Sequence, residues 1–252
     1  MSKNFKEAFE KTKIAGSIAA GALDEVSKIV KPGISTNEID KTCYEYINDH
    51  KAYSAPLYYR GFPKSCCTSV NHVVCHGIPS EKILRDGDIM NVDVTALKEG
   101  WHGDTSRMFK IGEVSVKAEK LIQTTYEAMM KAIKVVKDGA LLGDIGSAIQ
   151  SHVESNGFSV VQDFCGHGIG QSFHQEPNVL HYGKKGTGEK IKSGMIFTIE
   201  PMINLGRFET KTLKDGWTAV TKDKTLSAQF EHTIGVTNEG YEIFTLSSDK
   251  IN

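Results

Sequence analysis

The chain has 252 residues, 39% of them hydrophobic, and its 30 basic and 31 acidic residues leave a formal net charge of -1. This length and composition provide for a buried core and argue against a disordered or fibrous chain. Because the charge is balanced and no stretch approaches the roughly 20 apolar residues that span a bilayer, we expect a soluble, cytoplasmic protein with no specific nucleic-acid or membrane partner.

A pair of helices is predicted at the start of the chain. Hydrophobic side chains in residues 5–29 recur with a helical period, and the Lys-Pro-Gly sequence that ends at Gly33 terminates this helix. Ser35 and Glu38 have the spacing of a capping box, in which each side chain satisfies a backbone N–H of the other residue. They predict a second helix that runs to about His50.

A strand and a hairpin follow, and they carry two aspartates. Residues 89–97 alternate between apolar and polar side chains, so Asp93 lies on the polar face of a half-buried strand. Lys98-Glu-Gly100 predicts a loop of about four residues, which would place Asp104 directly opposite Asp93. Carboxylates in that position repel each other unless a cation lies between them. Two solvated surface aspartates are the alternative, since Asp is mostly exposed.

The second half of the chain repeats the first. Helices are predicted up to Gly139, which corresponds to Gly33 at an offset of 106, and then to about Asn156. Segment 87–93 aligns with segment 194–200 at an offset of 107. In this alignment Asp93 corresponds to Glu200. We interpret this as two helix-helix-strand units about a pseudo-twofold axis, with chance similarity of helix ends as the alternative. Because no linker separates them, a single domain over residues 1–252 is expected.

Three further potential ligands follow the aspartates. His167 lies in a glycine-rich segment, and Glu200 and Glu231 alternate with apolar residues, so both acids would be half-buried and in need of a partner. Four acids and one histidine suit Co, Mn, Fe or Zn. Two such ions roughly 3.5 to 4 Å apart would activate a shared water for hydrolysis of a carbonyl or phosphoryl group. His76 and His174 could assist the reaction, although each is also explained as an exposed loop residue.

Five motifs in the same order resemble those of type I methionine aminopeptidases over essentially the whole chain. They are Val73–Pro79, the pair of Asp93 and Asp104, Gly166–Gly170, Ile199–Pro201 and Gln229–Thr233. The resemblance implies a pita-bread fold, an α/β arrangement of two pseudo-symmetric halves with a central curved antiparallel sheet. It also implies metal-dependent removal of the N-terminal methionine from nascent proteins and peptides, favouring a small second residue, by a metal-bridging hydroxide.

The same resemblance assigns roles to individual residues. By it, Asp93 chelates one divalent ion, His167 and Glu200 hold the other, and Asp104 and Glu231 bridge the pair. The catalytic residues would be His76, His174 and Glu200, with Glu200 moving the proton. The residues of the substrate site would be Tyr59, Phe62, Cys67, His76, Phe173, His174 and Trp217. A monovalent cation near the cleft would be held by Asn71, Val73 and Ser227.

Further expectations concern partners and the rarer pocket residues. Phe62 stands where the commonest family pattern has tyrosine, and Pro56 stands where some relatives carry cysteine, so the methionine pocket is expected to differ in shape. The chain starts almost directly with the catalytic unit, so a minimal, bacterial-type enzyme is expected. We also expect a monomer that acts on peptide and nascent-protein N-termini and associates transiently with the ribosome.

Three alternatives belong to other functional classes or specificities. A proline-directed aminopeptidase of the same fold would use the same metal ligands, but usually carries an additional N-terminal domain. A non-catalytic protein of this fold would be expected to lack some ligands. A thiol redox protein would use Cys66 and Cys67, which lack the Cys-x-x-Cys spacing that lowers a thiol pKa. The five cysteines are an odd number without a secretion signal, so reduced thiols are expected: Cys43, Cys66, Cys67, Cys75 and Cys165.

Overall fold

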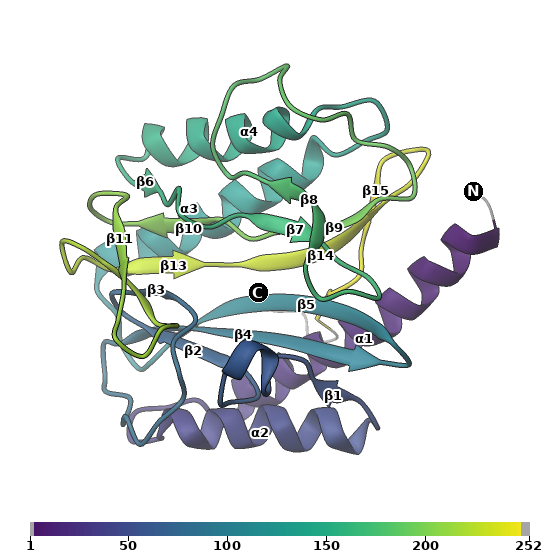
Figure 1. Cartoon of the computed structure of the whole chain (residues 1–252). Coiled ribbons are helices and arrows are strands. Elements are labelled where there is room, and N and C mark those ends of the chain that lie inside the picture. Colours follow the sequence, from purple (N-terminus) through teal and green to yellow (C-terminus); the bar gives the residue numbers. More distant parts are fainter. Residues whose placement is uncertain (1–2, 248–252) are drawn as a thin grey trace.

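The computed structural model describes residues 3–247 and arranges two pairs of helices around a curled antiparallel sheet (Figure 1). Both pairs cover the outer face of the curled sheet, one pair over each half. The helices are α1 (Lys3–Ile29), α2 (Thr36–Asp49), α3 (Val116–Lys134) and α4 (Leu142–Ser155). None of these helices has the length and apolar character that crossing a membrane requires.

The main sheet has nine strands, in the order β1-β4-β5-β14-β9-β7-β8, with β2 paired to β4 and β15 paired to β14. Its strands are β1 (Tyr53–Ser54), β2 (Cys67–Val70), β4 (Ile89–Lys98), β5 (Trp101–Lys110), β7 (Gly166–Gly168), β8 (Gln175–Val179), β9 (Ile196–Ile199), β14 (Glu231–Val236) and β15 (Tyr241–Ile243). Two three-stranded sheets flank it, made from β3 (Val73–Cys75), β6 (Ser159–Val160), β10 (Met202–Asn204), β11 (Thr210–Thr212), β12 (Ala219–Thr221) and β13 (Ser227–Gln229). The pairings between these strands are antiparallel, as expected.

The first helical pair follows the predicted boundaries closely. The Ser35 hydroxyl accepts a hydrogen bond from the Glu38 backbone N–H, and the Glu38 carboxylate accepts one from the Ser35 N–H at 2.8 Å. This capping box therefore begins α2, and the helix ends beside His50 as expected. Gly33 has a left-handed φ of 95°, which stops the chain from continuing α1.

The internal repeat is visible in equivalent backbone hydrogen bonds. The N–H of Gly33 donates to Leu84 at 2.8 Å, and the N–H of Gly139 donates to Ile191 at 2.9 Å. Gly33 and Gly139 both have left-handed φ angles, 95° and 87°. Each glycine thus ties a helix-helix turn to the segment that leads into a central strand of its own half. The prediction of two helix-helix-strand units is confirmed.

Two hydrophobic cores form where the helices pack on the outer face of the sheet. One joins α1 and α2 to β4 through side chains such as Leu23 and Val92, which are fully buried. The other joins α3 and α4 to β9 and β14 through side chains such as Leu121, Phe197 and Ile234. Because strand side chains alternate, the polar residues between these apolar ones face away from the helices. That inner face carries the site.

The hairpin between β4 and β5 corrects one prediction. Its turn is the two-residue Glu99-Gly100, with φ angles of 49° and 80°, and not a loop of about four residues. The register therefore pairs Asp93 with Ser106 and Thr95 with Asp104. The two aspartates are diagonal neighbours on one face of the sheet instead of direct opposites. Diagonal neighbours still lie close enough to share a ligand.

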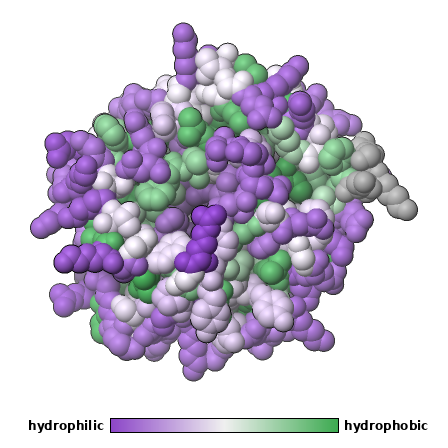
Figure 2. Space-filling view, viewed as in Figure 1, coloured by the Kyte–Doolittle hydropathy of each residue, from purple (hydrophilic) through white to green (hydrophobic). Residues whose placement is uncertain are grey.

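The molecular surface on the side shown in Figure 2 is predominantly hydrophilic, and its hydrophobic side chains occur in small, separated groups. Cys66 and Cys67 point to opposite faces of the sheet, as expected, because Cys66 packs in the α1–α2 core and Cys67 lines the central pocket. All five cysteines lie within residues 3–247, and all five are free thiols. The expectation of reduced cysteines is consistent with this arrangement.

Candidate metal centre and active site

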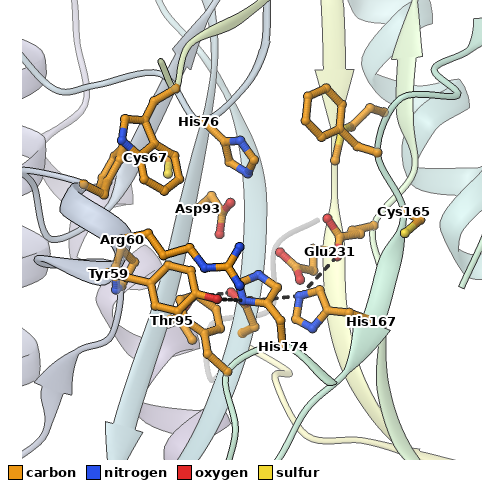
Figure 3. Close-up of a pocket in the computed structure, with 18 of the residues that line it drawn as sticks. Tyr59, Arg60, Cys67, His76, Asp93, Thr95, Cys165, His167, His174 and Glu231 are labelled. Atoms are coloured by element: carbon orange, nitrogen blue, oxygen red, sulfur yellow. Dashed lines mark hydrogen bonds and ion pairs between the residues drawn. The ribbon is translucent and has the colours of Figure 1, made fainter. Parts of the chain in front are cut away.

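A pocket of about 400 Å³ opens on the inner face of the sheet and contains every residue predicted for divalent-metal binding, catalysis and substrate binding (Figure 3). The predicted metal ligands there are Asp93, Asp104, His167, Glu200 and Glu231, and the predicted substrate residues are Tyr59, Phe62, Cys67, His76, Phe173, His174 and Trp217. These residues come from both halves of the chain. The site therefore exists only where the two halves meet.

The five predicted metal ligands converge at the inner end of this pocket. Ligand atoms of Asp104, His167 and Glu231 all lie within 4.8 Å of one another. The Nε2 atom of His167 lies 3.7 Å from Asp104 Oδ2 and 3.6 Å from Glu200 Oε1. Asp93 projects from the same face of the sheet as Asp104. Four acids and one imidazole in this arrangement can chelate divalent ions.

The electrostatics of this cluster favour a bound cation. Burial raises the pKa of Asp93 to about 7 and the pKa of Glu200 to about 8. Burial, together with the neighbouring carboxylates, also raises the pKa values of Asp104 and Glu231 well above their usual range. Glu231 Oε1 is buried without a hydrogen-bond partner. Since buried acids are costly unless they are paired or coordinate a metal, these residues fit divalent ions.

His167 is suited to be a neutral ligand. Burial lowers its pKa to about 4, so its imidazole is unprotonated near neutral pH and offers a lone pair. Its Nδ1 lies 3.1 Å from the Gly168 carbonyl oxygen, which assigns the proton to Nδ1 and leaves Nε2 facing the carboxylates.

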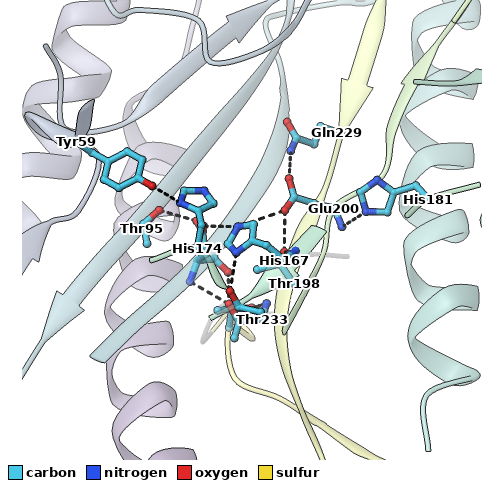
Figure 4. Close-up of polar contacts among 12 residues, drawn as sticks. Tyr59, Thr95, His167, His174, His181, Thr198, Glu200, Gln229 and Thr233 are labelled. Atoms are coloured by element: carbon cyan, nitrogen blue, oxygen red, sulfur yellow. Dashed lines mark hydrogen bonds and ion pairs between the residues drawn. The ribbon is translucent and has the colours of Figure 1, made fainter. Parts of the chain in front are cut away.

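Hydroxyl and amide groups hold the acidic side chains in place (Figure 4). Thr95 Oγ1 donates to Asp104 Oδ1 at 2.7 Å. Thr198 Oγ1 donates to Glu200 Oε1 at 2.7 Å and accepts from the His167 N–H at 3.0 Å. The Gln229 amide donates to Glu200 Oε2 at 3.5 Å. The sequence interpretation missed these residues, although each lies two positions from a predicted ligand in extended chain, and that spacing is a usable signal.

His181 is a second residue that sequence reasoning missed. Its Nε2 accepts a hydrogen bond from the backbone N–H of Glu200 at 3.2 Å. Burial lowers its pKa to about 3, so the ring stays neutral and keeps this acceptor. His181 therefore fixes the backbone at the end of β9, from which the Glu200 side chain enters the pocket. Nothing in its local sequence distinguishes it from an ordinary buried histidine.

Aromatic rings form the remaining walls of the pocket. The rings of Phe62 and Trp217 meet edge to face with centroids 5.2 Å apart, and His76 meets Trp217 at 6.0 Å. The Tyr59 hydroxyl lies 3.0 Å from His174 Nδ1, within hydrogen-bonding distance. Burial lowers the pKa of His76 and lowers that of His174 to about 3, so both rings are neutral. The wall that results combines apolar surface with two hydrogen-bonding imidazoles.

Several other side chains line the pocket that the sequence interpretation did not assign to it. They include Arg60, Thr95, Asp163, Phe164, Cys165 and Met202. Pro56 also lines it, at the position expected to alter its shape. Arg60 is labelled in Figure 3, where its side chain points into the pocket.

The residues predicted for a monovalent cation lie outside this pocket. The Ser227 N–H donates to the Asn71 carbonyl at 2.9 Å, so these two residues are in direct contact. The Asn71 side chain is already engaged, since its amide donates to Asp88 and its oxygen accepts from the Ile89 N–H. Val73 follows on β3. The monovalent cation stays a prediction.

Comparison with known proteins places this architecture in a family. The model of metallopeptidase family M24 matches residues 10–238 of the chain. The chain belongs to this family. As an M24 metallopeptidase, it is a hydrolase, and the family implies divalent metal ions, in agreement with the acidic cluster described above. The α/β pita-bread fold expected from the sequence is confirmed.

Individual M24 relatives resemble the chain over nearly its full length. It is 57% identical over 245 residues to a methionine aminopeptidase of Rickettsia prowazekii, covering 97% of this chain and 95% of the relative. The crystal structure of a methionine aminopeptidase from the same species matches with a TM-score of 0.95, covering 96% of this chain and 98% of that one. The prolidase of Pyrococcus furiosus shares only the fold, with a TM-score of 0.77 at 21% identity, and this chain covers 65% of it.

Proposed function

We propose that this M24 metallopeptidase removes the N-terminal methionine from peptides and proteins whose second residue is small. The observation that carries the proposal is the convergence of the five-ligand cluster and an aromatic-lined wall in a single pocket. The 57% identity to a methionine aminopeptidase over 97% of the chain supports the choice of methionine as the residue released.

The acidic cluster would hold two divalent ions, drawn from Co, Mn, Fe and Zn. Asp93 would bind one ion, His167 and Glu200 the other, and Asp104 and Glu231 would bridge them. When bound, such ions lower the pKa of water and polarise the scissile carbonyl. Oxygen and nitrogen ligands accept several first-row metals, so cellular availability would decide among them.

The chain's own residues would then bind the substrate and move its proton. The methionine side chain would pack against Phe62, Cys67 and Trp217, where thioether contacts with aromatic rings contribute roughly 0.3 to 1.5 kcal/mol each. Tyr59 and Phe173 complete that wall. His76 and His174, as neutral imidazoles, would hydrogen-bond the scissile peptide group. Glu200 would accept the proton of the attacking water and deliver it to the leaving nitrogen.

The proposal also covers the cellular setting. We propose that residues 1–252 act as one catalytic domain, although residues 1–2 and 248–252 lie outside the described part of the chain. The enzyme would work as a cytoplasmic monomer on nascent-protein N-termini, with transient contact to the ribosome. A monovalent cation at Asn71, Val73 and Ser227 would support the strands beside the cleft.

Peptide turnover tests this function against its nearest alternative. The metal-loaded protein should release methionine from Met-Ala-Ser and leave Ala-Pro-Ala intact. Efficient cleavage of Ala-Pro-Ala with none of Met-Ala-Ser would establish a proline-directed enzyme instead. If the metal-loaded protein were inert on both peptides and Asp104→Ala left its metal binding unchanged, a non-catalytic binding protein would be the better description.

A further inference from the structure

Arg60 lines the pocket but has no part in the proposed chemistry. Within residues 3–247 it is the only arginine or lysine in the pocket lining. Its side chain is exposed at the pocket mouth and points inward (Figure 3). A permanent positive charge therefore lies at the pocket mouth, where it is accessible to a bound peptide.

The backbone around Arg60 is built to hold it in this position. Tyr58 and Arg60 both have left-handed φ angles, 65° and 47°, which non-glycine residues rarely adopt. The turn is closed by hydrogen bonds from the Tyr58 N–H to Phe62 at 2.8 Å and from the Gly61 N–H to Tyr58 at 3.2 Å. Strained backbone of this kind persists where surrounding structure enforces it, and it concentrates at functional sites.

The guanidinium is held on one face only. It lies 5.3 Å from the centre of the Tyr59 ring, in a cation–π arrangement. No hydrogen bond or ion pair joins it to another side chain in the part of the chain that the structure describes. Asp163, which lines the pocket from the other half, already accepts a hydrogen bond from Thr210 Oγ1 at 2.5 Å. The five donors of Arg60 therefore remain available to a ligand.

The position of a bound substrate chain follows from the proposed function. With methionine against Phe62 and Trp217 and the scissile bond near His76 and His174, the second residue still lies inside. An extended chain advances roughly 3.3 to 3.6 Å per residue, so the third residue is the first to reach the mouth. We propose that Arg60 pairs there with an acidic side chain at the third position, so that substrates of the form Met-small-Asp and Met-small-Glu are preferred. This inference rests on the proposed function.

The expected size of the preference follows from solvent exposure. An ion pair in contact with water is weak, so the acidic peptide should exceed its neutral counterpart in kcat/KM by about twofold to fivefold. The gain should fall mainly on KM, because the contact lies away from the reacting atoms and is made equally in the ground state and the transition state. It should shrink in about 0.5 M salt, which screens exposed charges.

Three C-terminally amidated peptides test the inference: Met-Ala-Asp-Ser, Met-Ala-Asn-Ser and Met-Ala-Lys-Ser. For the wild-type enzyme, kcat/KM should fall in that order. Arg60→Gln should bring the Asp-to-Asn ratio to about one, and Arg60→Glu should reverse the order of the Asp and Lys peptides. Arg85 is an exposed arginine outside the pocket, so Arg85→Gln is the matched control and should keep the wild-type ratios.

The outcomes separate this inference from the function on which it rests. Release of methionine from all three peptides at equal kcat/KM by wild type would overturn the role of Arg60 and leave the proposed function standing. A preference for Asp that Arg60→Gln did not change would also overturn it. No release of methionine from any peptide by the metal-loaded wild type would overturn both.

Discussion

Glu200 is the residue at which most of the site's interactions meet. Its carboxylate accepts from Thr198 and Gln229, its backbone N–H donates to His181, and its Oε1 lies 3.6 Å from the His167 ring. A side chain restrained at both oxygens and at its backbone cannot rotate freely. This restraint suits the two roles proposed for Glu200, as a metal ligand and as the group that moves the proton.

Replacing Glu200 by Gln keeps the size and shape of the side chain, but it should remove the proton acceptor and weaken metal binding. We expect methionine release from Met-Ala-Ser to fall by about 10²- to 10⁴-fold, the usual contribution of general acid–base catalysis. Turnover should be measured beside metal content. Glu239→Gln, at an exposed acid, is the control and should behave as wild type. Wild-type turnover in Glu200→Gln would contradict the assigned role.

Thr198 acts through its neighbours, because it donates to Glu200 and accepts from the His167 N–H. Thr198→Val keeps the shape and removes both hydrogen bonds, so metal affinity should fall about 10- to 100-fold. Thr198→Ser restores the hydroxyl and should recover most of that affinity. Titration with Mn²⁺ measures both variants, and Thr212→Val, at an exposed threonine of β11, provides the control. Equal affinities of the Val and Ser variants would show that the hydroxyl is unimportant.

At the scale of elements, the start of α2 shows how local sequence sets a boundary. Ser35 caps the helix and Glu38 closes the reciprocal hydrogen bond. Ser35→Ala should lower the free energy of unfolding by about 1 kcal/mol, because one backbone N–H at the helix start loses its partner. Urea unfolding measures the change. Ser151→Ala, at an exposed serine in α4, should have a much smaller effect, and equal losses in the two variants would contradict the capping role.

The same capping box predicts a pH dependence. Hydrogen bonds from Ser35 hold the pKa of Glu38 below its usual value in the folded chain. A lowered pKa means that Glu38 stabilises the fold above its unfolded pKa, and that this contribution is lost as the pH falls through the folded value. The stability difference between wild type and Glu38→Gln should therefore be present at pH 7 and shrink below about pH 4.3.

Chelator-treated protein unfolded by urea at several pH values would measure that difference. A gap between wild type and Glu38→Gln that stays constant from pH 7 to pH 3 would show that ionisation of Glu38 is irrelevant to helix stability. Metal ligands titrate in both proteins, so their contribution cancels in the comparison.

At the scale of the whole molecule, the proposed metal centre lies between two halves that each have their own hydrophobic core. Divalent ions that bind the folded chain should stabilise it, by about 2.7 kcal/mol at a concentration 100 times the dissociation constant. Thermal unfolding with Mn²⁺ and with a chelator should show a higher midpoint for the loaded protein. Asp104→Ala should abolish most of this shift. A midpoint independent of metal would contradict a metal centre at this seam.

Local sequence determined the helices and strands of this protein and pointed to its acidic cluster. The capping box, the helix-ending glycines and the two-residue alternation of strand side chains are short-range signals, so the helices and the repeat could be predicted. The acids of the proposed ligand set could be singled out because buried acids demand partners, and the structure brings them together in one pocket. The register of the β4–β5 hairpin could not be predicted. It is set by a two-residue turn in which Glu99 adopts a left-handed φ, a conformation that a glutamate rarely takes.

Only the tertiary structure decided which distant residues meet. His181 contacts Glu200 across 19 positions, and Thr198 contacts His167 across 31, while their local sequences resemble ordinary core. Arg60 likewise reads as a surface charge until the left-handed turn directs it into the pocket. The physical reason is that strand pairing and helix packing bring these groups together through contacts of long range. The sequence names the proposed ligands, but the register and packing of the two halves place them around one site.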